Sequence, residues 1–232
     1  MALRSVVRVA LVLAVVGVPV FSATVAAAAQ TAIAPAPREQ KRLGKQSVLR
    51  AGLKGISSLQ DASGGFLPSP DNPVDPRATA DVVSMMISLR NAGVEVELDA
   101  AVAYVQQTDP VTWVESQGVT LTDSEVAKIV MALVGAGADP RDVGGNDLVA
   151  RIADSWDDEA GIYGSALWES PFVVTALTVA DEPIEDQAIE TIAAAQLGDG
   201  SWSSSGATGP GSGDAWTTAW IVQALVARRP GR

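Results

Sequence analysis

The sequence predicts an all-α protein built from about four stacked helical hairpins. The first observation is an internal repeat of about 45 residues, marked by a leucine in an apolar run at Leu89, Leu133, Leu177 and Leu225. The second is a pair of large apolar residues three and four positions before each leucine, which gives every copy the same helical face. The third is that glycine-rich turns separate the runs, without an alternating strand pattern. Such repeats indicate two-helix units, because one hairpin cannot bury its own apolar face.

The N-terminal segment has the order of a secretory signal peptide. Arg4 and Arg8 give a basic start, residues 9–20 are apolar but short for a membrane span, and Ala26 to Ala29 offer small residues for cleavage. We therefore assign residues 1–29 to a signal peptide cleaved near Ala29 and expect a secreted mature chain without a transmembrane segment. A retained N-terminal anchor is the alternative, which the small-residue end and the following Ala-Pro stretch disfavour.

The rest of the chain divides into a linker, a repeat domain and a tail. Residues 30–38 are an Ala/Pro-rich linker, residues 39–227 are the repeat domain, and residues 228–232 are the tail. The first helices of the four hairpins are expected at residues 39–60, 98–107, 147–153 and 184–195. The second helices contain the repeated leucines and are apolar over most of their circumference. They are therefore expected to form an inner layer that the first helices cover.

Capping signals mark the ends of the second helices. Asp75, Asp123 and Asp214 are predicted N-caps, and Pro76 stands at a first helical position, where proline is favoured. Gly93 and Gly137 are predicted stops, since glycine readily adopts the left-handed conformation that ends a helix.

A glutamine and a Gly-aromatic turn connect the helices of a hairpin. Gln196 is followed by Gly200 and Trp202 in the last copy. The glutamine amide is expected to bond the backbone of the turn, glycine lets the chain bend, and the aromatic ring fills the space between the layers. The first copy repeats this brace with Gln60, Gly64, Gly65 and Phe66, and degenerate versions follow at Gln106 with Trp113 and at Asp154 with Gly161 and Tyr163.

A helix ending in glutamine, a Gly-aromatic turn and a helix beginning Asp-x-x-Thr-Ala together resemble the squalene cyclase and protein prenyltransferase repeat of the α/α-toroid superfamily. The residues that carry the resemblance are Gln196, Gly200, Trp202 and residues 214–219 in the last copy, and Gln60, Gly64, Gly65, Phe66, Asp75, Thr79 and Ala80 in the first. The resemblance covers about residues 39–227. It implies a terpenoid cyclase-like, α/α-toroid-like array, as a partial or small α/α barrel.

The residues that enzymes of this superfamily use are missing from the chain. It has no histidine and no cysteine, so the Asp-Cys-His zinc site of prenyltransferases and the thioester of complement-type relatives cannot form. The Asp-x-Asp-Asp proton donor of class II terpene cyclases does not occur either. We therefore expect a short, secreted, non-enzymatic member of this type.

Composition excludes further chemistry. Disulfides, Ser-His-Asp and Cys-His catalysis and any His or Cys zinc site are impossible without histidine and cysteine. The formal net charge is −11, which disfavours nucleic acid as a partner. The acids Asp154, Asp157, Asp158 and Glu159 could supply oxygen ligands, but their spacing is not that of a calcium loop. We expect no metal and no cofactor. Abundant Ala, Val, Gly and Asp are compatible with a high-GC bacterial source.

The candidate site is one face of the inner helices. Counted back from each leucine, positions −9, −8 and −5 lie together, away from the constant apolar face. Acids recur there in three copies, and aromatic residues stand beside them in the last two. If the helices line a concavity, this face suits an apolar or cationic ligand through stacking and cation–π contact. The predicted ligand-binding residues are Asp81, Glu125, Glu169, Trp168, Phe172, Trp216 and Trp220.

A structural interpretation of the same residues stays open. Asp81 and Glu125 could be acids that stabilise the first turn of a helix, and Trp216 and Trp220 could fill the core or cover an open end. The sequence Ser170-Pro171 could also start the third inner helix late and leave Trp168 and Glu169 in the preceding loop.

Three functions remain. The preferred one is a non-catalytic module that binds an apolar, isoprenoid-like or lipid-like ligand, or a protein partner, on its concave face. The alternative is an isoprenoid cyclase-like enzyme in which Asp81, Glu125 or Glu169 is a buried proton donor. The second alternative is a structural protein of the cell envelope. A row of four hairpins leaves apolar flanks, which predicts either capping by the chain ends or a homodimer.

Overall fold

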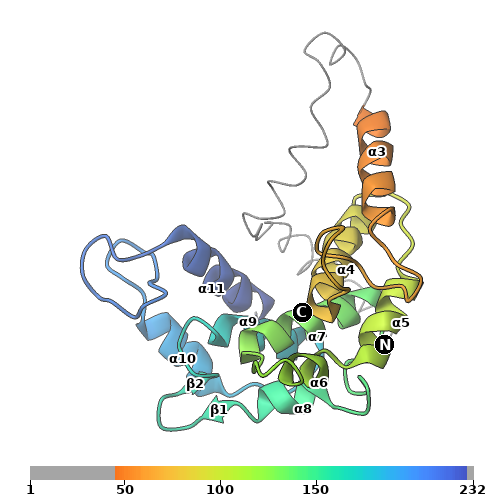
Figure 1. The fold of residues 1–232 in the computed structure, drawn as a ribbon. Helices are drawn as coiled ribbons and strands as arrows, with labels where there is room; N and C mark the ends of the chain where they lie inside the picture. The colour runs from red at the N-terminus through yellow and green to blue at the C-terminus, as the bar shows by residue number, and fades with distance from the viewer. Residues whose placement is uncertain (1–44, 229–232) are drawn as a thin grey trace.

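The structure is a computed structural model that describes residues 45–228 (Figure 1). The predicted signal peptide, the Ala/Pro-rich linker, residues 39–44 of the predicted repeat domain and residues 229–232 of the tail lie outside the described residues. None of the described helices is long and apolar enough to cross a membrane.

The predicted all-α class is confirmed. Residues 45–228 form nine helices, of which the one between α5 and α7 was not predicted. They are α3 (Lys45–Ser57), α4 (Pro76–Asn91), α5 (Asp99–Thr108), α6 (Pro110–Glu115), α7 (Asp123–Ala136), α8 (Leu148–Ala153), α9 (Ser170–Val179), α10 (Asp186–Ala194) and α11 (Ala215–Ala227). The expectation of no strand was wrong in one place, where β1 (Trp156–Asp157) and β2 (Ile162–Tyr163) form an antiparallel pair in the third brace.

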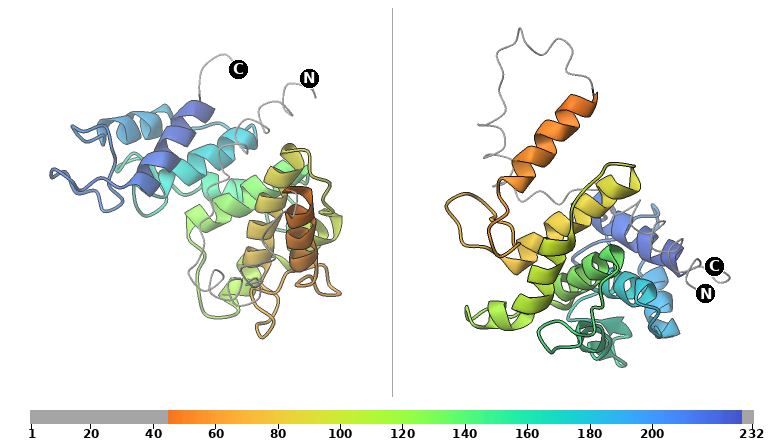
Figure 2. Two further views of the ribbon diagram at one scale, coloured as in Figure 1. Left: turned by 90° about the horizontal axis from the view of Figure 1, so that it is seen from above. Right: turned by 90° about the vertical axis from the view of Figure 1, so that its right-hand side faces the viewer.

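The inner helices form a row. Helix α4 packs against α7, α7 against α9, and α9 against α11 (Figures 1 and 2). Of the other helices, α5 packs against α4, α8 against α7 and α9, and α10 against α9. The middle of the row is the core, with Val130, Leu133, Val173, Val174 and Leu177 almost fully buried. Helices α4 and α11 end the row and stand apart (Figure 1). On these end helices Met85 and Val222, members of the predicted apolar face, are each 47% exposed because no further inner helix covers them.

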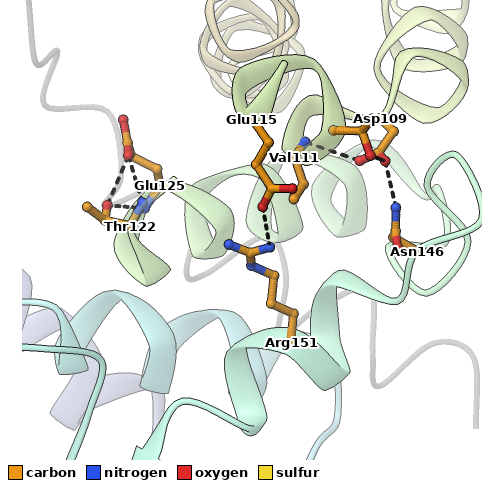
Figure 3. A network of polar contacts seen from close by, with 8 residues as sticks. Asp109, Val111, Glu115, Thr122, Glu125, Asn146 and Arg151 are labelled. Carbon is orange, nitrogen blue, oxygen red and sulfur yellow. Dashed lines mark hydrogen bonds and ion pairs between the residues drawn. The ribbon is translucent and has the colours of Figure 1, made fainter. Parts of the chain in front are cut away.

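Two of the three predicted N-caps are confirmed. The Asp75 side chain accepts a hydrogen bond from the backbone N–H of Arg77, and that of Asp214 accepts one from Thr217. Asp123 was the wrong residue, because Thr122 caps α7 and forms a capping box with Glu125 (Figure 3). Gly93 and Gly137 both have the predicted left-handed conformation after their helices.

The unpredicted helix α6 begins at a buried acid that the sequence analysis did not single out. Asp109 is 6% exposed and has φ 49°, and its carboxylate accepts hydrogen bonds from the Val111 N–H and the Thr112 hydroxyl. It also accepts one from the Asn146 amide at 2.6 Å, which ties α6 to the loop before α8 (Figure 3). Asp-Pro is a helix-start signal, so the sequence contained this information. Trp113 therefore lies on a helix and not in a brace turn.

The predicted brace is confirmed in the first and last copies of the repeat. The Gln60 amide donates to the Gly64 carbonyl at 2.8 Å, and the Gln196 amide donates to the Gly200 carbonyl at 3.0 Å. The aromatic rings of Phe66 and Trp202 are 3% and 4% exposed, as expected for plugs between two layers.

A hydroxyl on the inner helix completes the first, third and fourth braces. The Phe66 N–H donates to Thr79 Oγ1 at 2.9 Å, and the Trp202 N–H donates to Thr218 Oγ1 at 3.0 Å. The third brace does the same, since the Tyr163 N–H donates to the Ser170 hydroxyl at 2.8 Å. Each hydroxyl therefore fixes the position of its inner helix relative to the preceding turn.

This shared contact changes the alignment of the first copy. Thr218 and Ser170 precede Leu225 and Leu177 by seven residues, and the residue seven after Thr79 is Met86. Met86 is 5% exposed and takes the place that the sequence analysis gave to Leu89. In the corrected alignment, position −5 of the first copy is Asp81 and position −9 is Arg77.

Candidate binding face on the inner helices

One residue from each inner helix contributes to a strip across the row. At position −5 these residues are Asp81, Lys128, Phe172 and Trp220. Lys128 lies close enough to Asp81 to lower its pKa, and the Lys128 ammonium stands 5.5 Å from the centroid of the Phe172 ring. The rings of Phe172 and Trp220 are 4.1 Å apart between centroids. The strip is therefore charged on α4 and α7 and aromatic on α9 and α11.

The structure brings all four predicted aromatic residues together. Trp216 lies 5.5 Å from Phe172 and 6.5 Å from Trp220, and Trp168 lies 6.4 Å from Trp216 and 6.5 Å from Phe172, between ring centroids. Phe172 is fully buried, Trp168 and Trp220 are half-buried, and Trp216 is 38% exposed. The buried Phe172 ring thus supports the three tryptophan rings, which reach the surface. We call Trp168, Phe172, Trp216 and Trp220 the aromatic cluster.

The spacing of the rings selects the kind of ligand. Centroids 4.1 to 6.5 Å apart mean that the rings touch one another, so no cation fits between them as it would in an aromatic cage. The cation that the cluster does meet is Lys128 of the chain itself. What the cluster offers from outside is an apolar surface, which favours an apolar ligand over a cationic one.

Asp81 lies on the inner face beyond the first turn of α4. The pKa of Asp81 is raised, first because the surrounding protein displaces part of its hydration. The Lys128 ammonium and, more weakly, Arg77 lower this pKa, whereas the carboxylates of Asp75 and Glu125 raise it. A helix-dipole role is less suitable here than for Glu125, because Asp81 is the sixth residue of α4. Asp81 is the predicted acid that combines access to solvent with a perturbed pKa.

Glu125 has a local structural task. Its carboxylate accepts hydrogen bonds from the Thr122 N–H at 2.9 Å and from the Thr122 hydroxyl at 3.1 Å (Figure 3). These bonds close the N-terminus of α7, so the structural interpretation of Glu125 is supported.

Glu169 is buried just before α9 and is 1% exposed. One of its oxygens accepts hydrogen bonds from the backbone N–H of Ser165 at 2.8 Å and from the Ser165 hydroxyl at 3.0 Å, and among residues 45–228 the other oxygen has no hydrogen-bond partner. The pKa of the nearby Asp123 is raised, first by burial and then by electrostatic repulsion from Glu169. Helix α9 starts at Ser170, so Trp168 and Glu169 do lie in the preceding turn, as the late-start alternative predicts.

The acidic turn at residues 154–159 is organised by its own backbone. Asp157 accepts hydrogen bonds from the N–H groups of Glu159 and Ala160 at 3.0 and 2.9 Å. Within residues 45–228, no group of three or more acidic side chains is placed to hold a metal ion.

Replacing Asp81 with asparagine is expected to stabilise the protein at neutral pH. Its raised pKa means that the folded chain binds a proton more tightly than the unfolded chain does, so the ionised carboxylate opposes folding above the folded-state pKa. The gain should fall as pH drops through that pKa and vanish below the unfolded value of 3.8, where both states are protonated. Thermal unfolding of both chains across this range checks the sign.

Asp199→Asn is the matched control of opposite sign. Hydrogen bonds from the Ser201 hydroxyl and N–H lower the pKa of Asp199, so its ionised form favours folding. The control should lose stability at neutral pH and lose nothing in acid. An Asp81→Asn chain that is also less stable at neutral pH would contradict the argument.

Searches for relatives assign the chain to no group. No protein-family model matches it, and no curated protein does.

Proposed function

We propose that this protein is a secreted, non-catalytic module that binds an apolar small molecule of isoprenoid or lipid type on the inner face of its helix row. The observation that supports the proposal is the aromatic cluster, in which a buried Phe172 holds three tryptophans at the surface. Secretion is the sequence-based part of the proposal, because it depends on the signal-peptide pattern of residues 1–29. The toroid-like resemblance stays an expectation about the arrangement.

Binding is favoured over catalysis by the tasks of the three candidate acids. Glu125 closes the capping box of α7, the buried Glu169 accepts hydrogen bonds from Ser165, and Asp81 lies beside the cation Lys128. A proton donor for an apolar substrate needs a free carboxylic acid that faces the substrate. The rings, by contrast, need no further partner to hold an apolar molecule by contact area and stacking.

Fluorescence titration with a fifteen-carbon isoprenoid alcohol tests the proposal. Saturable quenching of tryptophan emission is expected, because three of the six tryptophans belong to the cluster. Trp216→Ala should weaken binding by up to about tenfold, since one aromatic contact contributes about 0.5–1.5 kcal/mol.

Trp156→Phe is the matched control. Trp156 is also half-buried, but its ring packs on Tyr163 at 5.0 Å in the third brace, away from the cluster. This variant should bind as the unmodified chain does. Absence of saturable binding by the unmodified chain, together with a bare mass in native mass spectrometry of protein purified from its host, would reject the proposal.

A further inference from the structure

The outward side of α11 is an apolar face at the end of the row. Its main neighbour is α9, against which it buries Thr217, Ile221 and Ala224. The opposite side of the helix is open to solvent, with Val222 47% and Val226 37% exposed. Ala215 and Ala219 are exposed on the same side. We call Ala215, Ala219, Val222 and Val226 the α11 seam.

The seam has the spacing of a helix-pairing surface. Its residues follow one another at intervals of four, three and four, which keeps them on one side of a helix and is the pattern of two helices in lengthwise contact. Alanine at two of the positions lets a second helix approach closely. A solitary surface helix would carry polar residues there, and terminal units of helical arrays normally do.

The seam is complementary to itself. When two copies of α11 lie antiparallel about a twofold axis between Trp220 and Ile221, Ala215 faces Val226 of the other copy and Ala219 faces Val222. Small then meets large at all four positions, which is the condition for interdigitated packing. An unrelated helix would have to supply this order by chance.

Charge selects the same arrangement. The chain has a net charge of −11, so two copies repel each other over most of their surfaces. None of the thirteen residues of α11 is charged. The charged residues that flank the helix are already engaged within each copy, because Asp214 caps α11 and Arg228 forms an ion pair with Asp186 at 2.6 Å. The two helix dipoles also oppose each other.

We propose that a second copy of this chain covers the α11 seam, so that two rows of inner helices join across a twofold axis through antiparallel α11 helices. The inference is independent of ligand binding, because the seam points away from α9 while Phe172 and Trp220 contact each other on the inner face. A contact of two short helices is near the lower limit of stable interfaces, so the dimer is expected to be reversible.

Sedimentation velocity of the purified full chain, from micromolar to submillimolar concentration, is the first test. A concentration-dependent shift from monomer to twice the mass is expected. Val222→Glu should shift the midpoint at least tenfold toward higher concentration, because it buries a carboxylate in the seam. Val119→Glu is the control, since Val119 is 52% exposed but lies in the loop before α7. A wild-type chain that stays monomeric, or a Val222→Glu chain that dimerises equally well, would overturn the proposal.

Cross-linking then tests the register. The chain has no cysteine, so each introduced thiol is unique. A mixture of Ala219→Cys and Val222→Cys chains should form a covalent dimer on mild oxidation, because the two positions face each other. A mixture of Ala215→Cys and Ala219→Cys chains should not, since their positions are displaced by seven residues along the helix. Equal cross-linking in both mixtures would contradict the antiparallel pairing.

Discussion

Replacing Gly64 with alanine should destabilise the protein far more than the same change at Gly200. Both glycines hold the same position in a brace, with φ 92° and 86°, and both carbonyls accept the glutamine amide. At Gly64 an added Cβ would collide with the Ala100 carbonyl, whose carbon would lie 2.8 Å away. At Gly200 the nearest atom is Gln196 Nε2 at 3.9 Å.

Comparing Gly64→Ala with Gly200→Ala separates two contributions to the loss of stability, the cost of the left-handed backbone conformation and the cost of the steric clash. The left-handed conformation costs a non-glycine residue about 1–2 kcal/mol, and this is the whole loss expected for Gly200→Ala. Gly64→Ala should lose that amount and at least about 2 kcal/mol more, because backbone and not a movable side chain blocks the Cβ. Chemical unfolding of the two variants measures the difference. Equal losses would mean that α5 can move away from the brace without cost.

Trp202→Ala is expected to lower the free energy of unfolding by about 3–5 kcal/mol. The Trp202 ring is 4% exposed between α10 and α11, and its indole N–H donates to the Ile192 carbonyl at 2.7 Å. The truncation removes the plug, opens a cavity and leaves a buried carbonyl without a donor.

Trp202→Phe distinguishes the two parts of this loss. Phenylalanine occupies the equivalent place in the first brace, so the position accepts a smaller ring. Only the hydrogen bond and the difference in ring size are lost, and about 1–3 kcal/mol is expected. Thermal unfolding of both variants gives the comparison, at about 2–4 °C per kcal/mol for a chain of this size. A phenylalanine variant as unstable as the alanine variant would show that the indole bond, and not the plug, stabilises the brace.

Some details could be read from the sequence because they depend on neighbouring residues. The Asp75 and Asp214 caps, the left-handed Gly137 and the two glutamine braces are local hydrogen-bond patterns, and the structure has all of them. The Asp123 cap was wrong because Thr122, one residue earlier, competes for the same N–H groups. Helix α6 was missed because Gln106 and Trp113 were aligned with the brace of the other copies, which assigned the residues of this helix to a turn.

The candidate site also has a part that the sequence could predict and a part that depends on tertiary packing. Aromatic residues at repeat positions −9 and −5 could be identified from spacing, and the structure brings all four of them together. The capping box of Glu125 with Thr122 is also local and could have been read from the sequence, whereas the burial of Glu169 and the charged surroundings of Asp81 depend on how separate helices pack.

By itself, the sequence determined the all-α class, the apolar inner helices and the chemistry of the first and last braces, since periodicity and short-range bonding are encoded within each repeat. Only the tertiary structure decided that Met86 and not Leu89 aligns with the later leucines, because the Thr79 hydroxyl contact fixes the position of α4 across thirteen residues. It also decided that the four aromatic rings touch and that one side of α11 is uncovered. Both follow from how separate helices pack, which no local pattern specifies.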